Sequence, residues 1–204
     1  MIIKVCGMRD SDNIRAVEEL GVDWMGFIFY NKSSRFVSEV PEYLPLKSKR
    51  VGVFVNEALE TILQTSSMFS LDFVQLHGNE SPEFCETLST CGLSIIKAFS
   101  ITDNKEFESE KFKPYESFCD YFLFDTKTEL FGGSGKKFNW EILSDYFGNT
   151  PFLLSGGISP DDVEEIKSFV HPKYAGIDLN SRFEITPAYK NIKLLQNFIK
   201  EIRQ

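Results

Sequence analysis

A cysteine and an aspartate in this chain could carry out proton transfer together. Cys6 directly follows the apolar run 2–5, and Asp125 directly follows the apolar run 121–124. A thiol beside cations or a helix N-terminus can become a thiolate, and a partly desolvated carboxyl group has a raised pKa that suits a general acid. Each residue also has a structural explanation, because free cysteines are often small buried hydrophobes and strand-end aspartates often cap helices or form salt bridges. The two positions together favour acid–base chemistry.

A pair of glycines forms a candidate anion site. Residues 155–159 read Ser-Gly-Gly-Ile-Ser and stand directly before Pro160. Gly156 and Gly157 let backbone N–H groups approach an anion closely, and the start of a following helix favours negative charge. A tight turn that needs positive φ would explain the pair without any ligand. Barrel enzymes often hold phosphate after their seventh and eighth strands, so the phosphate interpretation depends on the fold.

Short apolar runs must position these residues. Each run is nearly continuously hydrophobic, which is typical of strands covered on both faces in a parallel sheet. There are eight runs, at residues 2–5, 24–29, 51–55, 73–76, 95–99, 121–124, 152–154 and 174–177. Helical segments lie between them, and the clearest begins at Ser159-Pro160. Residues 38–46, which hold two prolines, give the weakest of the helix predictions.

Eight strands that alternate with helices admit a closed (β/α)8 TIM barrel or an open doubly wound sheet, and the number eight favours the barrel. A single catalytic domain over residues 1–204 requires short loops, because such barrels are seldom shorter. Polar residues at the strand ends of a barrel share one mouth, so Arg35, His77, Lys97 and Asp178 are expected to face it. Lys97 could instead be a packed or ion-paired barrel lysine, and it is not counted among the catalytic residues. The glycine-bearing residues 132–135 predict a mobile loop after the sixth strand.

Charge and composition limit the partners. The formal net charge of −8, without a dense basic stripe, predicts neither nucleic acid nor an anionic membrane as a partner, although one small anion can still bind locally. The first apolar run is too short for a signal peptide, and no later run is long enough to span a bilayer. The four cysteines form no CxxC pair and the two histidines lie far apart. We therefore expect free thiols, no metal site and a cytoplasmic location.

Six ordered segments resemble the phosphoribosylanthranilate isomerase family of tryptophan biosynthesis. They are KVCGMR at 4–9, SRFV at 34–37, VFVN at 53–56, QLHG at 75–78, LFDT through GGSGKKFNW at 123–140, and LSGGI at 154–158. A seventh segment, DLNSRFE at 178–184, is similar to the family's phosphate loop. The resemblance covers nearly the whole chain, and six ordered matches are highly specific together.

The resemblance implies an Amadori rearrangement of N-(5′-phosphoribosyl)anthranilate to 1-(2-carboxyphenylamino)-1-deoxyribulose 5-phosphate, with no metal or organic cofactor. It implies that Asp125 is the general acid, which protonates the ring oxygen, and that Cys6 is the general base, which removes the C2′ proton. Arg35 would hold the anthranilate carboxylate. The remaining implied binding residues hold the phosphate or contact the sugar: Gly156, Gly157, Asp178, Asn180 and Ser181.

Three residues carry further expectations. Ser34 stands where the family commonly has proline, which is a minor change in loop stiffness. Arg182 stands at the family's usual glycine, where it either strains a turn that needs positive φ or adds a charge near the phosphate. His77 is expected to form hydrogen bonds near the mouth rather than to transfer protons.

Rival functions make demands on the sequence, and neither the constellations of a synthase or an epimerase nor the oxyanion loop of a hydrolase is evident in it. An indoleglycerol-phosphate synthase would need catalytic Lys and Glu residues at strand ends, and a ribulose-phosphate epimerase would need a metal-binding His/Asp set. A hydrolase that pairs Cys6 with His77 would need an oxyanion loop. A catalytically silent phosphate-binding barrel would keep the glycine pair and tolerate loss of Cys6. The sequence also leaves the choice between monomer and homodimer open.

Overall fold

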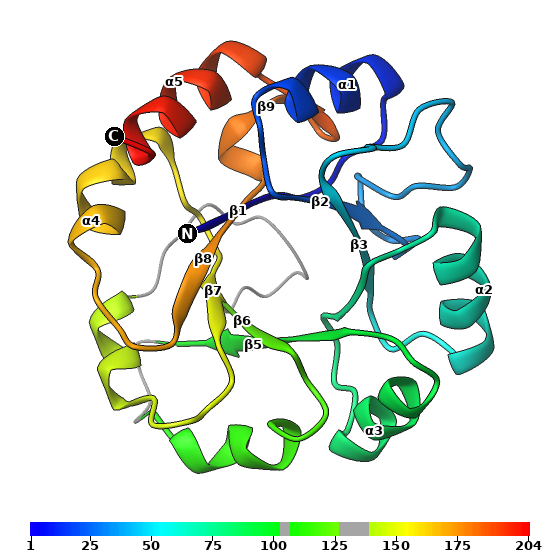
Figure 1. Cartoon of the computed structure of the whole chain (residues 1–204), viewed down its shortest axis with the longest axis vertical. Coiled ribbons are helices and arrows are strands. Elements are labelled where there is room, and N and C mark those ends of the chain that lie inside the picture. Colours follow the sequence, from blue (N-terminus) through cyan, green and yellow to red (C-terminus); the bar gives the residue numbers. More distant parts are fainter. Residues whose placement is uncertain (103–106, 127–138) are drawn as a thin grey trace.

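Eight parallel strands form a closed barrel in the computed structural model, which describes residues 1–102, 107–126 and 139–204. They are β1 (Ile2–Val5), β2 (Trp24–Ile28), β3 (Lys49–Phe54), β4 (Phe73–Leu76), β5 (Ile95–Ile101), β6 (Tyr121–Thr126), β7 (Phe152–Leu154) and β8 (Tyr174–Leu179). Each strand pairs with its successor, and β8 pairs with β1 to close the sheet. Figure 1 shows the helices around the strands. The predicted TIM barrel is confirmed.

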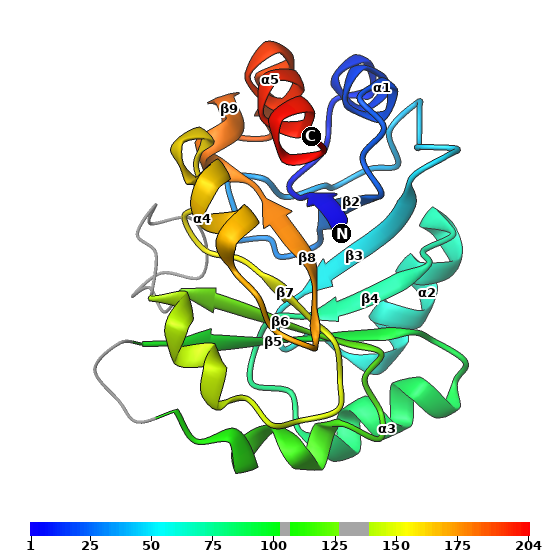
Figure 2. The same ribbon diagram turned by 60° about the vertical axis from the view of Figure 1, so that its left-hand side comes forward.

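Helices cover the outside of the barrel. The α-helices of the described residues are α1 (Ser11–Glu19), α2 (Leu59–Phe69), α3 (Pro82–Thr90), α4 (Val163–Ser168) and α5 (Ile192–Ile202). Four 3-10 helices join them in this part of the chain: η1 (Ser109–Tyr115), η2 (Trp140–Asp145), η3 (Pro160–Asp162) and η4 (Ser181–Phe183). A small antiparallel hairpin, β9 (Glu184–Thr186) and β10 (Tyr189–Lys190), follows η4. The last helix, α5, contacts α4 and α1 and so completes the ring, as Figures 1 and 2 show.

Two Ser-Pro sequences start helices as predicted. The Ser81 hydroxyl accepts a hydrogen bond from the Phe84 N–H at 3.3 Å, and Pro82 occupies the first turn of α3. Ser159 donates its N–H to the Asp162 carboxylate at 2.7 Å in a capping box. This second start passes through the 3-10 turn η3 before α4 begins.

Residues 38–46, all of which are described, form no helix, so the expectation of a helix here is wrong. The Glu18 carboxylate of α1 anchors this part of the chain instead. It accepts hydrogen bonds from the Tyr43 hydroxyl at 2.5 Å and from the Lys47 N–H at 2.6 Å. The segments after β5 and β6 also differ from the expected α-helices, since the described residues there form the 3-10 helices η1 and η2, and Pro114 lies inside η1.

Strands β5, β6 and β8 extend past the ends of their apolar runs. Asp125 lies within β6 and Asp178 within β8, although the sequence placed both after the strand. Pairing with the neighbouring strand explains the extension, because Asp125 stands opposite Ser100 and Asp178 opposite Lys4. The mobile loop expected at residues 132–135 lies outside the described residues.

Aromatic rings close one end of the barrel interior. Trp24, Phe73 and Tyr121 stand at or near the starts of their strands, and the Trp24 ring lies 4.7 Å from the Phe73 ring and 5.0 Å from the Tyr121 ring. They belong to an interior apolar cluster that is separate from the larger cluster between the strands and the helices. The strand starts are therefore packed with apolar side chains, and the polar residues gather at the strand ends.

Phe112 tests how far η1 contributes to stability. It is fully buried and packs against the rings of Phe99, Phe122 and Phe124. We expect Phe112→Ala to lower the free energy of unfolding by about 3–5 kcal/mol, since a large buried side chain leaves a cavity. Phe147, which is 82% exposed, is the matched control, and its replacement by alanine should change the free energy by less than about 0.5 kcal/mol. Urea titration followed by circular dichroism measures the free energy of unfolding of both variants. Equal losses in the two would show that burial of Phe112 in η1 does not stabilise the fold.

Candidate active site

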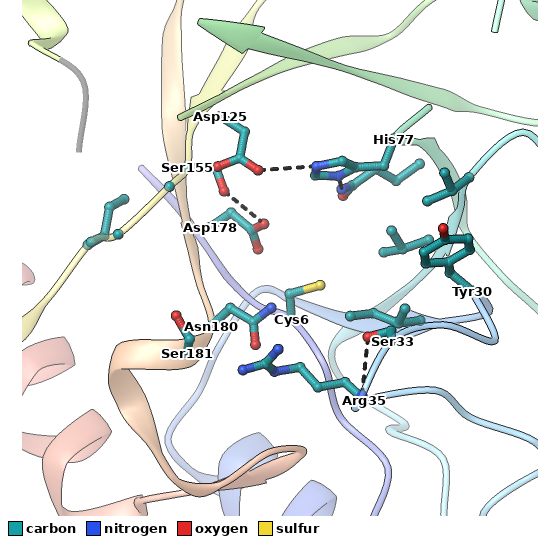
Figure 3. A pocket seen from close by; sticks show the side chains of 17 residues that line it. Cys6, Tyr30, Ser33, Arg35, His77, Asp125, Ser155, Asp178, Asn180 and Ser181 are labelled. Carbon is teal, nitrogen blue, oxygen red and sulfur yellow. Dashed lines mark hydrogen bonds and ion pairs between the residues drawn. The ribbon is translucent and has the colours of Figure 1, made fainter. Parts of the chain in front are cut away.

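A cavity opens at the carboxyl ends of the strands, and all eight site residues that the sequence predicted line it (Figure 3). These residues are Cys6, Arg35, Asp125, Gly156, Gly157, Asp178, Asn180 and Ser181. Strands or strand-end loops from seven of the eight barrel strands contribute to the lining, with β5 as the exception among the described residues. The barrel therefore brings together in space residues that are far apart in the chain.

Cys6 is held tightly at the end of β1. Its N–H donates to the Leu179 carbonyl oxygen at 2.8 Å, and only 4% of the residue is exposed. A Cβ atom at Gly26 on β2 would lie 2.6 Å from the Cys6 sulfur, so that glycine makes room for the thiol. Burial raises the pKa of Cys6, and Asp178 acts in the same direction, whereas Lys4 and Lys190 lower it. The expected cations are present, but burial outweighs their effect.

The raised pKa predicts how Cys6 reacts with alkylating agents. At pH 7.5, iodoacetamide should modify the exposed Cys91 well before Cys6. Because only the thiolate reacts, the rate at Cys6 should rise about tenfold per pH unit until the pH passes its pKa, which lies above the ordinary 9.0. Peptide mass mapping over a pH series measures both rates. A Cys6 rate that levels off below pH 8 would contradict the raised pKa.

Asp125 belongs to a chain of three polar side chains. Its Oδ2 lies 3.1 Å from Nε2 of His77, and Nδ1 of the same ring lies 2.8 Å from Nε2 of Gln75. With the Gln75 amide as donor to Nδ1, the ring proton sits on Nε2 and is donated to Asp125. His77 therefore forms hydrogen bonds at the mouth, as expected. Gln75 was not predicted as a site residue, although the QLHG segment contains it.

Gly156 and Gly157 both adopt positive φ, at +85° and +73°. A Cβ atom at Gly156 would lie 2.4 Å from the backbone nitrogen of Thr126 and 2.6 Å from Oδ1 of Asp125. The glycine is thus required by its backbone conformation and by its close approach to β6. The turn interpretation is therefore confirmed, and this turn also lines the cavity beside Asp125.

Asp178 is tied to a buried lysine that the sequence did not single out. Lys4 on β1 is fully buried and donates to Oδ1 of Asp178 at 2.8 Å, and Ser155 Oγ lies 3.4 Å from Oδ2. Burial alone would lower the pKa of Lys4, but Asp178 and Cys6 outweigh that effect and raise it. Lys4 therefore carries its charge below the cavity floor.

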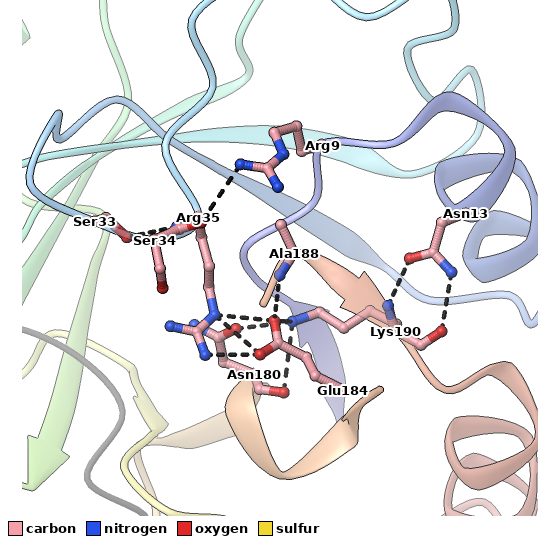
Figure 4. A network of polar contacts seen from close by, with 9 residues as sticks. All are labelled: Arg9, Asn13, Ser33, Ser34, Arg35, Asn180, Glu184, Ala188 and Lys190. Carbon is pink, nitrogen blue, oxygen red and sulfur yellow. Dashed lines mark hydrogen bonds and ion pairs between the residues drawn. The ribbon is translucent and has the colours of Figure 1, made fainter. Parts of the chain in front are cut away.

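Arg35 also has a partner that the sequence did not predict. Its Nε donates to Oε1 of Glu184 at 2.9 Å and its Nη2 donates to Oε2 at 2.7 Å, while Lys190 approaches Oε1 at 2.6 Å (Figure 4). Arg9 supports the loop that carries Arg35, through a hydrogen bond to the Ser34 carbonyl oxygen at 3.4 Å. Glu184 ends the DLNSRFE segment, which was a signal for it, whereas nothing in the sequence pointed to Lys190.

The remaining expectations concern Arg182 and Lys97. Arg182 is exposed within η4, and the non-glycine residues with positive φ in the described chain are Asn56, Ser70 and Ala188. The turn is therefore not strained at Arg182, which is also not among the residues that line the cavity. Lys97 is buried against Glu80 at 3.1 Å, away from the cavity lining.

Two searches of the described residues gave negative findings. No group of three or more His, Cys, Asp or Glu side chains in the described ranges is placed to hold a metal ion. No helix there is long and apolar enough to cross a membrane.

Known proteins match this chain over its whole length. The sequence model of the N-(5′-phosphoribosyl)anthranilate (PRA) isomerase family matches residues 3–201. The chain is 54% identical to the N-(5′-phosphoribosyl)anthranilate isomerase of Parabacteroides distasonis, with 99% of this chain and 93% of that protein aligned. It also resembles two solved structures, each 31% identical to this chain and each aligned over 100% of this chain and 99% of the other. One, with a TM-score of 0.81, shows monomers generated from the dimeric phosphoribosylanthranilate isomerase of Thermotoga maritima. The other, with a TM-score of 0.79, is a phosphoribosylanthranilate isomerase in complex with reduced 1-(o-carboxyphenylamino)-1-deoxyribulose 5-phosphate.

Proposed function

Since the chain belongs to the N-(5′-phosphoribosyl)anthranilate isomerase family, we propose how its own residues carry out the family's reaction. The chain is a phosphoribosylanthranilate isomerase of tryptophan biosynthesis, which converts an aminoaldose phosphate into an aminoketose phosphate. One observation carries the assignment of roles: a single cavity holds Cys6, Asp125, Arg35 and the glycine pair.

The first step is ring opening, in which Asp125 is the general acid. The proton of its carboxyl group passes to the furanose ring oxygen, the bond from that oxygen to C1′ breaks, and the anthranilate nitrogen supplies electrons to form a cationic Schiff base. His77 holds one carboxyl oxygen of Asp125 by a hydrogen bond and so orients the carboxyl group at the mouth of the cavity. The other oxygen lies beside the Gly156 backbone.

The second step is proton removal at C2′, in which Cys6 as thiolate is the general base. The electrons of the C2′–H bond form the C1′–C2′ double bond and neutralise the Schiff base, which gives an enolamine that tautomerises to the ketone. Before substrate binds, burial raises the pKa of Cys6 and so disfavours the thiolate. The cationic Schiff base supplies an opposite charge beside Cys6 at the moment the thiolate is needed, and such a charge lowers a thiol pKa.

The substrate's anionic groups would be held at two places. The glycine pair, with Asn180 and Ser181 on the loop after β8, would hold the phosphate through backbone and side-chain donors. Asp178, already tied to Lys4, would contact the sugar hydroxyl groups. The end of the Arg35 guanidinium that Glu184 leaves unoccupied would hold the anthranilate carboxylate.

We also propose that residues 1–204 act as one catalytic domain in the cytoplasm, as monomer or homodimer, on a phosphorylated small molecule and not on nucleic acid. The net charge of −8 supports the last point. The free cysteines suit a reducing compartment. Sedimentation equilibrium distinguishes the two oligomeric states.

The activity is tested with purified protein and freshly made phosphoribosylanthranilate, by following the loss of anthranilate fluorescence. We expect turnover at the same rate with and without EDTA. A rate that EDTA abolishes would favour a metal-dependent barrel enzyme and refute the acid–base roles. No turnover above the spontaneous rate would favour the catalytically silent barrel.

A further inference from the structure

Glu184 restricts how Arg35 can meet an anion. A guanidinium group has five N–H donors, of which the Nε and Nη2 edge forms one fork and the Nη1 and Nη2 end forms another. The Glu184 carboxylate occupies the first fork, at 2.9 Å from Nε and 2.7 Å from Nη2. Nη1 has no hydrogen-bond partner among the described residues, and Arg35 lines the cavity. A substrate carboxylate can therefore use only the Nη1 and Nη2 end.

Lys190 fixes the position of Glu184 from behind. It is fully buried at the end of the β9–β10 hairpin, and its ammonium lies 2.6 Å from Oε1 of Glu184. Its backbone is held as well, because Asn13 on α1 accepts from the Lys190 N–H at 2.7 Å and donates to its carbonyl oxygen at 3.0 Å. The Ala188 N–H adds a third donor to the Glu184 carboxylate at 3.1 Å. Glu184 therefore cannot move away from Arg35 without breaking its ion pair with Lys190 and its hydrogen bond with Ala188.

Lys190 also orients Asn180, which lines the same cavity. An ammonium group only donates hydrogen bonds, so the atom of Asn180 that lies 2.8 Å from it must be the carbonyl oxygen Oδ1. The amide NH₂ group of Asn180 is consequently a donor on the other side of that side chain. A Cβ atom at Gly7 would lie 2.7 Å from Arg35 Cδ and 2.9 Å from Asn180 Oδ1, so Gly7 packs against both side chains and limits their movement. Figure 3 shows Arg35 and Asn180 beside Cys6.

The ionisable side chains around Arg35 carry a net positive charge. Arg35 and Glu184 form one partly buried pair, and Lys4 and Asp178 form a second, buried pair. Each pair is neutral as a unit, and Lys190 in its protonated form supplies one additional positive charge. Burial lowers the pKa of Lys190, and the adjacent Glu184 carboxylate acts in the opposite direction and favours the charged form. An anion beside Arg35 would otherwise meet the full negative charge of Glu184 at short range, where a low dielectric strengthens the repulsion. Lys190 is placed to compensate that charge.

We propose that Lys190 is a positioning residue for recognition of the substrate carboxylate: it holds Glu184 and Asn180 and offsets the Glu184 charge, so that the free end of Arg35 binds an anion. The inference rests on the proposed role of Arg35. It extends that role to a residue that does not itself line the cavity. Loss of Lys190 should weaken ligands with a carboxylate much more than ligands without one.

Two inhibitors test this inference, the reduced product analogue and its counterpart in which a phenylamino group replaces the carboxyphenylamino group. The ratio of their Kd values isolates the carboxylate contribution and does not depend on the fraction of folded protein. In the unmodified protein the carboxylate should improve binding by about 10- to 100-fold, as charge-assisted hydrogen bonds do. In Lys190→Met the ratio of the two Kd values should fall below about 3-fold. In turnover of the substrate by the same variant, the loss of kcat/KM should come mostly from a higher KM and little from a lower kcat. Lys190→Gln keeps hydrogen-bonding atoms and removes the charge, so it should fold and show the same fall.

Two further variants distinguish an error in the role of Lys190 from an error in the proposed role of Arg35. Lys97→Met also removes a buried, ion-paired lysine, but one away from Arg35, and it should leave the ratio unchanged. Arg35→Met should reduce the ratio to about one, and an unchanged ratio there would refute the proposed role of Arg35 itself. If Arg35→Met loses the ratio while both Lys190 variants keep it, Lys190 is only structural and the inference is wrong. A comparable fall in Lys97→Met would also overturn it.

Discussion

Replacing Cys6 by alanine should lower kcat by about 10²- to 10⁴-fold, the usual contribution of a general base. Alanine cannot accept the C2′ proton, and none of the other groups that line the cavity is a thiol. The Kd of the reduced product analogue should change by less than about 3-fold, since the small side chain contributes little to binding. Stopped-flow fluorescence measures the turnover, and titration of the analogue measures the binding.

The exposed Cys91 at the end of α3 provides the matched control. Cys91→Ala should keep full activity and full stability. Cys6→Ser should be almost as inactive as Cys6→Ala, because a hydroxyl group is a far weaker base precursor than a thiol. Near-normal turnover in Cys6→Ala would remove Cys6 from the mechanism and return it to the role of a small buried hydrophobe.

Replacing Asp125 by asparagine should lower kcat by about 10²- to 10⁴-fold as well, since the amide keeps the shape of the carboxyl group but has no acidic proton. The hydrogen bond from His77 to the side-chain oxygen can persist, so the cavity should keep its form. Loss of anthranilate fluorescence measures the rate. The analogue Kd should stay close to that of the unmodified protein.

Asp145, an exposed aspartate at the end of η2, is the control for this change. Asp145→Asn should be fully active. A fall in kcat/KM that arises only from KM in Asp125→Asn would assign Asp125 to substrate binding and would leave the general acid unidentified.

The strands could be predicted well because their signal is local. A strand that is buried on both faces consists of consecutive apolar residues, so it can be recognised from a short piece of sequence. The barrel was predicted from the number of such strands, which is eight. The bounds were less accurate, since pairing to a neighbouring strand carries β6 as far as Thr126 and β8 as far as Leu179, past the ends of the apolar runs. Residues 38–46 were mistaken for a helix because the carboxylate that anchors them, Glu18, belongs to a distant element.

In the candidate site too, the residues with a local sequence signal were predicted and those that depend on distant elements were missed. Cys6, Asp125 and the glycine pair were found because they end apolar runs, and a barrel brings all such ends together. Glu184 and Lys190 were missed because only the folded hairpin brings them to Arg35. The raised pKa of Cys6 was missed as well, since the extent of its burial depends on the packing against Gly26 and cannot be seen in the residue type.

The contact between Gly156 and β6 has a consequence for protein engineering. Any side chain at position 156 would collide with Asp125 and with the backbone of Thr126. The loop proposed to hold phosphate and the proposed proton donor therefore cannot be redesigned as independent modules. A library that grafts a new ligand loop onto this scaffold must either keep glycine there or rebuild the end of β6 at the same time, and single-site searches at this position would reach only inactive variants.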